Sequence, residues 1–215
     1  MLTSGNFVRG IQIVLLAAAA LAVYELRWTA LFVALCTWAL TLSPKPFARW
    51  LGIDLPPSFL VAIVFFIFAT LFLGEVGDFY ERFWWWDVVL HGGSALALGL
   101  FAFLFIFMLF EGDHYAAPPW AVGYLSFTVA MAIGACWEIF EFGMDQAFGL
   151  NMQKSGLVDT MWDLIVDFIG ASIAGVTGFL YLKRVELGSL RFVLDDFVLR
   201  NRKLYRKLRR RPEAD

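Results

Sequence analysis

Six long apolar segments constrain what this chain can fold into. A helix that crosses a bilayer needs about 20 mostly apolar residues, and six stretches approach or exceed that length. They lie near residues 11–24, 28–42, 59–73, 87–110, 120–145 and 159–182. The sequence therefore predicts an all-α polytopic membrane protein, a bundle of about six transmembrane helices formed by residues 1–182.

The composition agrees with this prediction and excludes other classes. The chain is 60% hydrophobic and only 17% charged, whereas a soluble domain is roughly 45–50% apolar and about 25% charged. A formal net charge of −2, with the basic residues clustered at one end, argues against a nucleic-acid partner. Cys36 and Cys136 both lie in apolar segments, so we interpret them as small buried hydrophobes and not as a disulfide framework.

The basic residues predict an orientation in the membrane. Cytoplasmic connections of membrane proteins carry an excess of Lys and Arg, and 11 of the 17 basic residues follow position 182. With that tail in the cytoplasm, Arg9, Lys45 and Arg49 also fall inside, and only Arg27, Arg82 and Lys154 fall outside. We therefore expect both termini to be cytoplasmic.

Two terminal segments have specific interpretations. Residues 183–215 form the predicted cytoplasmic basic tail, and residues 187–208 within it have the pattern of an amphipathic helix on the inner membrane surface. The first apolar segment has an alternative interpretation, because Arg9, the apolar stretch and Ala20-Leu21-Ala22 also resemble a cleavable signal peptide.

Acidic residues gather at the predicted outer ends of the last four segments. Ten of the 19 carboxylates lie there. They are Glu75, Asp78, Glu81, Asp87, Glu138, Glu141, Asp145, Asp159, Asp163 and Asp167.

Helical spacing places the deeper acidic residues in three stripes. In chain order the stripes are Asp87 and His91; Glu138, Glu141 and Asp145; and Asp159, Asp163 and Asp167. At about 100° per residue, each stripe spans about 80° or less of its helix. Small residues on the same faces let helices approach closely. We therefore expect the three stripes to face one another.

At this depth, either some of the carboxylates are protonated or a cation neutralises them, and the scarcity of nearby basic side chains favours a bound cation. A carboxylate at the bilayer centre costs roughly 2.5–3.5 kcal/mol, and Asp167 lies about 12 Å deeper than Asp159 along its helix. The predicted ligands are the deepest groups, His91, Glu138, Asp163 and Asp167. Carboxylates with one imidazole suit Mg²⁺, Mn²⁺ or Ca²⁺, and Zn²⁺ or Fe²⁺ are alternatives.

Other acidic residues receive secondary interpretations. Asp87 and Glu141 are candidate catalytic residues, because a carboxylate beside the cation could act as a general base. Asp145, Asp159 and Glu75 are secondary ligand candidates. Asp159 is alternatively an N-cap, and Glu75 is alternatively a solvated surface charge.

Three motifs resemble a known family. They are Trp86-Asp87-x-x-Leu90-His91, Trp137-Glu138-x-x-Glu141-x-x-x-Asp145 and Asp159-Thr160-x-x-Asp163-x-x-x-Asp167-x-x-Gly170. In this order they resemble the bacterial inner-membrane YjdF-like proteins, a family without assigned function. More distantly they are similar to the VanZ-like membrane proteins, although Glu141 and Asp167 stand where those proteins carry Gln and Asn. The resemblance implies a multi-pass protein of the bacterial inner membrane in a cell-envelope context.

Three functions fit the sequence. The first is metal-dependent chemistry on a lipid head group or lipid-linked envelope substrate in the outer leaflet. The second is a non-catalytic scaffold that holds a structural metal. The third is an ion- or proton-coupled transporter, because carboxylates within the membrane are typical of proton relays. Membrane lipids are the predicted partners.

Overall fold

The computed structural model describes residues 4–110 and 117–203, which form helices and connections without any strand. Six helical segments are long and apolar enough to cross a membrane. Their bounds are Ser4–Tyr24, Trp28–Trp50, Pro57–Val76, Trp85–Phe110, Pro119–Phe148 and Leu157–Leu182. The prediction of an all-α polytopic membrane protein with six spans is confirmed, and the helices extend a few residues beyond the predicted segments.

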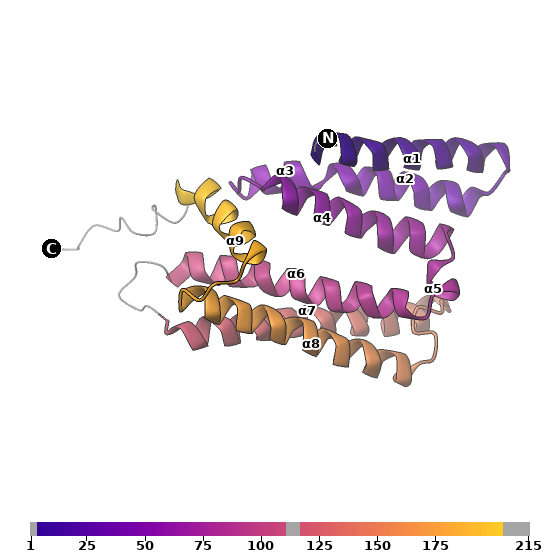
Figure 1. Ribbon diagram of the computed structural model, residues 1–215. Coiled ribbons are helices and arrows are strands. Elements are labelled where there is room, and N and C mark those ends of the chain that lie inside the picture. The colour runs from indigo at the N-terminus through magenta and orange to yellow at the C-terminus, as the bar shows by residue number, and fades with distance from the viewer. Residues whose placement is uncertain (1–3, 111–116, 204–215) are drawn as a thin grey trace. The chain divides into compact units, whose positions relative to one another are not determined.

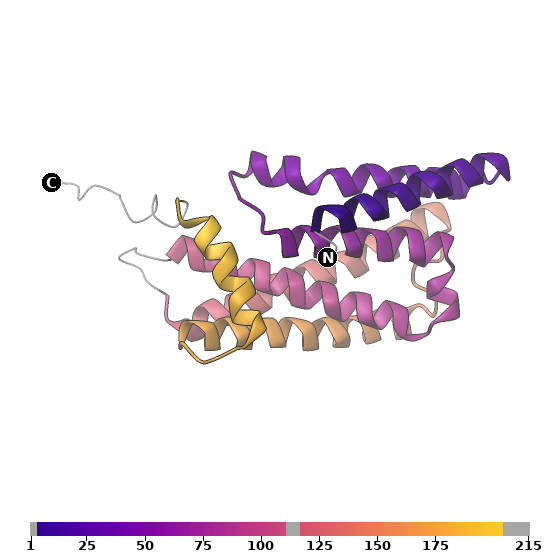
Figure 2. The ribbon, with the colours of Figure 1, turned by 45° about the horizontal axis from the view of Figure 1, so that its top comes forward.

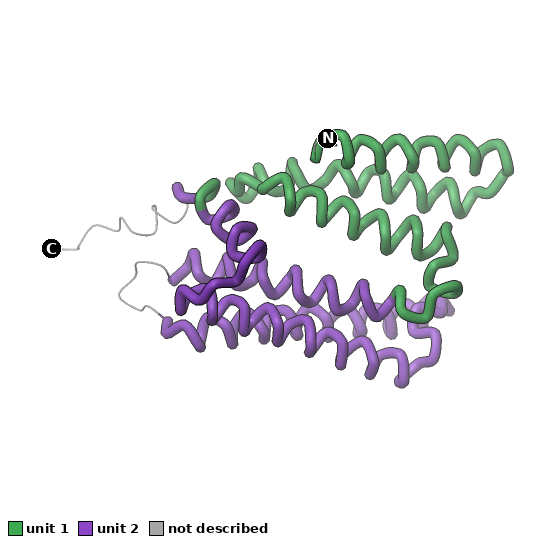
Figure 3. The backbone as a smooth tube through the Cα atoms, in the orientation of Figure 1, with its two compact units in different colours: residues 1–86, 199–201 green, residues 87–198, 202–215 purple. Residues whose placement is uncertain are grey.

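The chain divides into two compact units (Figure 3), which are described separately. The first unit covers residues 1–86 and 199–201. Its helices are α1 (Ser4–Tyr24), α2 (Trp28–Leu42), α3 (Pro44–Trp50), α4 (Pro57–Ile67), η1 (Phe68–Val76) and α5 (Phe79–Arg82). Figure 1 shows α1, α2 and α4 running alongside one another. Val8, Ile11 and Leu15 of α1 pack with Leu60 and Val64 of α4 to form its apolar core.

Two local features of the first unit were not foreseen. The connection after α2 contains the short helix α3, whose first residue is Pro44; proline suits this position because its missing N–H is not needed there. The third span changes from α-helix to π-helix at Phe68. The Gly77 N–H ends this segment by bonding the Phe72 carbonyl, five residues earlier. Hydropathy reports only that a segment is apolar, so it cannot distinguish these helix types.

The second unit covers residues 87–198 and 202–215 and contains α6 (Trp85–Phe110), α7 (Pro119–Phe148), α8 (Leu157–Leu182) and most of α9 (Ser189–Arg200). Figures 1 and 2 show α6, α7 and α8 side by side. Glycines permit this close approach. A Cβ added to Gly170 of α8 would lie 2.5 Å from the Gly92 carbonyl of α6, and a Cβ on Gly123 of α7 would lie 2.6 Å from the Gly175 carbonyl of α8.

The described part of the basic tail begins with α9. The Tyr181 hydroxyl, near the end of α8, donates a 2.7 Å hydrogen bond to Asp195 of α9. The Arg191 guanidinium lies 5.2 Å from the centroid of the Tyr181 ring and 3.7 Å from Asp195. These contacts hold α9 against the end of α8. The predicted amphipathic helix over 187–208 therefore has a helical counterpart up to Arg200, and residues 204–215 of the tail lie outside the described residues.

Candidate metal site

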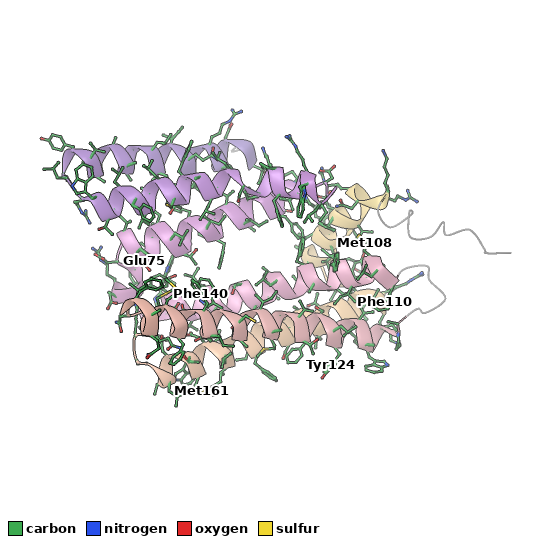
Figure 4. All side chains as sticks on the ribbon, turned by 180° about the vertical axis from the view of Figure 1, so that it is seen from behind. Glu75, Met108, Phe110, Tyr124, Phe140 and Met161 are labelled. Carbon is green, nitrogen blue, oxygen red and sulfur yellow. The ribbon has the colours of Figure 1, made fainter. Side chains whose placement is uncertain are left out.

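Three helices of the second unit supply the side chains of the site. Asp87 and His91 are one turn apart on α6, Glu138 is on α7, and Asp163 and Asp167 are one turn apart on α8. We call these five residues the His91 site. The site lies near the first turns of α6 and α8. Figure 4 shows Phe140 of α7 and Met161 of α8, close neighbours of the site in sequence, at one end of the unit, and Phe110 and Tyr124 toward the other.

The imidazole of His91 is central to the cluster. Its Nδ1 lies 3.5 Å from Asp167 Oδ1 and 3.9 Å from Glu138 Oε1. Its Nε2 lies 3.9 Å from Asp87 Oδ1. The two edges of one ring therefore face different carboxylates, with α7 and α8 on one edge and α6 on the other.

Three carboxylates of the site are buried, and several of their oxygens lack a hydrogen-bond partner among the described residues. Glu138, Asp163 and Asp167 are 4%, 3% and 1% exposed. Four of their oxygens have no hydrogen-bond partner among the described residues. They are both oxygens of Glu138, Oδ2 of Asp163 and Oδ2 of Asp167. An unpartnered buried charge is strongly unfavourable, so these carboxylates either carry protons or are balanced by a positive charge.

Gly134 makes room for one of these carboxylates. It lies on α7 one turn before Glu138, and an added Cβ would collide with the Asp167 carboxylate. Gly134 therefore forms the wall against which Asp167 rests. In the sequence, Gly134 stands four residues before Glu138 on the same helix face. That position indicated close helix packing, but it did not indicate contact with a carboxylate.

Asp87, His91 and Asp163 lie close enough together to hold a metal ion. One ligand atom from each lies within 4.8 Å of the other two. Two carboxylates and an imidazole are ligands that many divalent cations accept. Asp87 is the most open member, with a side chain 31% exposed against 10% for His91. This triad comes from α6 and α8 alone, and α7 joins the cluster through the contact of Glu138 with His91. Asp87, predicted as a general base, lies among the candidate ligands.

Glu141 has a defined position beside the site. It lies three residues after Glu138 on α7, and the Trp137 indole N–H donates a 3.0 Å hydrogen bond to its Oε1. The sequence placed both residues near the acidic stripes, but it did not indicate this bond. The i, i+4 spacing of Trp137 and Glu141 is the signal that could have revealed it.

Two secondary candidates hold the connection between α7 and α8. The Asp145 carboxylate accepts backbone N–H bonds from Met152 at 2.7 Å and Gln153 at 2.9 Å. Asp159 Oδ2 accepts a 3.2 Å bond from the Lys154 N–H. The interpretation of Asp159 as an N-cap is wrong, because α8 begins at Leu157 with Gly156 at the N-cap position. Gly156 has φ of +64°, a conformation that glycine adopts readily.

The last secondary candidate, Glu75, belongs to the first unit. It lies in η1, where its side chain is exposed. The residues that the structure brings together around His91 all come from the second unit.

Comparison with known proteins identifies a family. A protein of Thermotoga maritima described as "Uncharacterized protein" is 26% identical over 133 residues, 62% of this chain and 68% of that protein. No solved structure matches the chain. The VanZ-like resemblance stays a prediction, whereas the resemblance to a membrane-protein family of unassigned function is confirmed. The family model described as "Predicted membrane protein (DUF2238)" matches residues 7–184, so the chain belongs to the DUF2238 family of predicted membrane proteins.

Proposed function

We propose that this protein binds a divalent cation within the membrane at the His91 site. The observation that carries the proposal is the set of four buried carboxylate oxygens that have no hydrogen-bond partner among the residues described. A charged group in the membrane interior is expensive unless it is paired, and a bound cation is the largest local charge that could compensate several carboxylates together. The oxygen-rich ligand set favours Mg²⁺, Mn²⁺ or Ca²⁺ over Zn²⁺ or Fe²⁺.

The two edges of His91 suggest a division of roles. Asp87, His91 and Asp163 would hold the cation, with Nε2 of His91 as the nitrogen ligand on the Asp87 side. The ring's Nδ1 then carries the proton and faces Asp167 at 3.5 Å. Histidine ligands are commonly oriented in this way by a carboxylate behind the ring. Glu138, whose Oε1 lies 3.9 Å from His91 Nδ1, is available to complete the charge balance.

Metal-dependent chemistry on a lipid head group is the use of the cation that the geometry favours. In zinc proteins, structural sites are typically closed and catalytic sites keep one position open. By analogy, the 31% exposed side chain of Asp87 gives the triad an open side. Asp163 lies only about 9 Å along α8 from its first residue, a depth close to lipid head groups. A bound cation would supply a Lewis acid or an activated water there. Glu141, held by the Trp137 indole, would serve as general base.

Of the two other functions, the structural metal has specific support and the transporter lacks it. The deep burial of Asp163 and Asp167 suits a structural metal that joins the three helices. A proton-coupled transporter would need polar groups that continue from the His91 site toward the opposite end of α6, α7 and α8. In the described parts of α6–α8 beyond Asp167, no further carboxylate occurs toward that end. The Ser126 hydroxyl there is engaged in a 2.6 Å bond to the Gly99 carbonyl.

The cellular setting belongs to the same proposal. By the positive-inside rule, the basic tail supports a cytoplasmic location for both termini in a bacterial inner membrane. In that orientation α6 and α8 would begin at the outer face of the inner membrane, and the His91 site would lie in the outer-leaflet half, where lipid-linked envelope substrates would be available.

Metal analysis of the purified full chain tests the proposal. We expect the protein in detergent to retain about one divalent cation per chain, or to bind added Mn²⁺, Mg²⁺, Ca²⁺ or Zn²⁺ after chelation. Asp163→Asn should abolish binding. Glu186→Gln, which changes an exposed carboxylate beyond α8, is the matched control and should bind normally. Binding of none of these cations, with a thermal unfolding midpoint unchanged by chelator, would contradict the proposal.

A second comparison separates catalysis from a structural role. If the cation is structural, Asp87→Asn should lower the thermal midpoint of the metal-loaded protein as much as Asp163→Asn does. If the cation is catalytic, the unaltered protein should chemically modify lipid head groups when it is incubated with phospholipid vesicles. Asp87→Asn should then lose this activity while its fold stays intact. An ion flux in proteoliposomes that Glu138→Gln abolishes would instead support the transporter.

A further inference from the structure

We propose that a groove between α7 and α8 binds an anionic phospholipid, with an acyl chain in the groove and the head group at Lys183. The groove has a volume of about 360 Å³ and is lined almost entirely by apolar surface. Its residues come from the first half of α7 and the second half of α8. It therefore lies toward the opposite end of these helices from the His91 site, and it is independent of the function proposed there.

Two glycines create the groove. Gly123 and Gly175 face each other so closely that a Cβ on either would lie 2.6–2.7 Å from the other's carbonyl oxygen. Larger residues stand on both sides of this contact, with Phe127 on α7 and Phe179 on α8 among them. Because the two glycines have no side chains and the aromatic residues on either side do, a hollow remains along the helix pair.

The groove faces outward from the helix pair. Val176 in its wall is 56% exposed, and Trp120 at its end is 65% exposed. Because α7 and α8 are membrane spans, this exposed apolar surface lies in the hydrocarbon region. The matching occupant there is an acyl chain. From Ser172 to Phe179 the groove extends about 10 Å along α8, enough for the part of the chain nearest the head group.

A positive charge marks the head-group end. Lys183 directly follows α8, and its Nζ lies 5.8 Å from the centroid of the Phe179 ring, which lines the groove. Trp120 and Tyr124 line the same end, and such amphipathic rings prefer the level of the head groups. An ammonium at the head-group end of an apolar groove is complementary to a phosphate that carries an acyl chain.

This complementarity favours a lipid over a second copy of the chain. The groove wall contains no charged side chain, and the nearby Lys183 is exposed. A phospholipid satisfies both features with one molecule. Under the predicted orientation this end faces the cytoplasm, where anionic lipids attract basic residues near the membrane surface.

Native mass spectrometry of the full-length protein tests the inference. The protein in detergent is titrated separately with dioleoylphosphatidylglycerol and with dioleoylphosphatidylcholine, and the bound lipids are counted. We expect one phosphatidylglycerol to bind at lower concentration than phosphatidylcholine. Lys183→Gln should reduce this preference by about fivefold, the effect of one basic residue near a membrane surface. Arg9→Gln, at an exposed basic residue of α1, is its control.

A second pair of variants locates the acyl chain. Val176→Phe places a larger side chain in the groove and should weaken the binding of both lipids. Ile173→Phe adds a ring on an exposed position of the same helix that does not line the groove, and it should bind both lipids normally. Three results would overturn the inference: equal binding of the two lipids by the unaltered protein, normal binding by Val176→Phe, or a dimer that Val176→Phe converts to a monomer, which would identify a second copy as the occupant.

Discussion

Asp167 shows most clearly what the His91 site requires of single residues. It is 1% exposed, its Oδ1 faces His91 Nδ1 at 3.5 Å, and its Oδ2 has no partner among the described residues. Oδ1 is therefore in position to orient the imidazole, whereas Oδ2 contributes negative charge to the site. If Asp167 positions His91, replacing it with the uncharged asparagine should change metal binding and stability in opposite directions.

We predict that Asp167→Asn weakens metal binding by about 10–100-fold, the usual effect of losing a carboxylate that orients a metal-bound histidine. In the metal-free protein the same change should raise the thermal unfolding midpoint, because it removes one of several negative charges buried around a single imidazole. Calorimetric titration with Mn²⁺ and thermal melts with and without chelator measure both effects. A variant that is less stable in both conditions and binds Mn²⁺ normally would show that Asp167 has only a packing role.

Asp145 provides the contrasting case of a carboxylate whose partners are all local. It accepts two backbone N–H bonds from the connection after α7. We predict that Asp145→Asn destabilises the protein by about 1–3 kcal/mol, since an amide replaces one acceptor oxygen of a charged hydrogen-bonded group. Metal affinity should be unchanged. Chemical denaturation and Mn²⁺ titration check the two statements, and a large loss of affinity would make Asp145 a member of the site.

The residue types of the site were predictable, but their contacts were not. Spacing along each helix identified His91, Glu138, Asp163 and Asp167 as groups that share a depth and face one another, and the structure gathers them. Spacing does not determine how each helix is rotated about its axis or which rotamer a side chain adopts. That is why Asp87 was predicted as a base and lies in the triad, and why the local partners of Asp145 and Asp159 were missed.

At the scale of elements, the packing of α7 against α8 determines whether the site can form. Their contact depends on glycines at two levels, with Gly123 against Gly175 toward one end and Gly134 against Asp167 near the middle of the two helices. The six spans could be predicted because length and hydrophobicity suffice to identify them. The short helix α3 and the π-helical turn at Phe68–Val76 could not, because they depend on local hydrogen bonding and packing.

We predict that Gly134→Ala lowers metal affinity without altering any ligand, because the new Cβ would occupy the position of the Asp167 carboxylate. Gly143→Ala is a matched control on the same helix, since nothing lies within 4 Å of a Cβ there. The control should bind metal normally and gain about 0.5–1 kcal/mol of stability from the better helix propensity of alanine. Equal metal affinity in the two variants would show that Asp167 can move away from Gly134 at no cost to the site.

At the scale of the whole molecule, the distribution of basic residues is what predicts the leaflet in which the site lies. The connection between α7 and α8 contains Lys154 alone among basic residues, whereas 11 of the 17 follow position 182. Translocation of loops across a membrane is opposed by Lys and Arg, so this bias predicts that the tail stays in the cytoplasm and that the 149–156 connection crosses. The fold alone does not specify which end faces outward, because the same bundle could be inserted either way.

We predict that a green fluorescent protein fused after residue 215 is fluorescent in a bacterial host, and that a single cysteine introduced at Asn151 reacts with a membrane-impermeant maleimide in intact cells. Asn151 is exposed in the connection after α7. The control places the cysteine at Glu186, beyond the end of α8, and should react only after lysis; both labelling variants carry Cys36→Ala and Cys136→Ala. The opposite labelling pattern would put the His91 site in the inner leaflet. Cation binding could survive that result, but a role in chemistry on outer-leaflet lipids could not, because the site and its substrate would lie on opposite sides of the membrane.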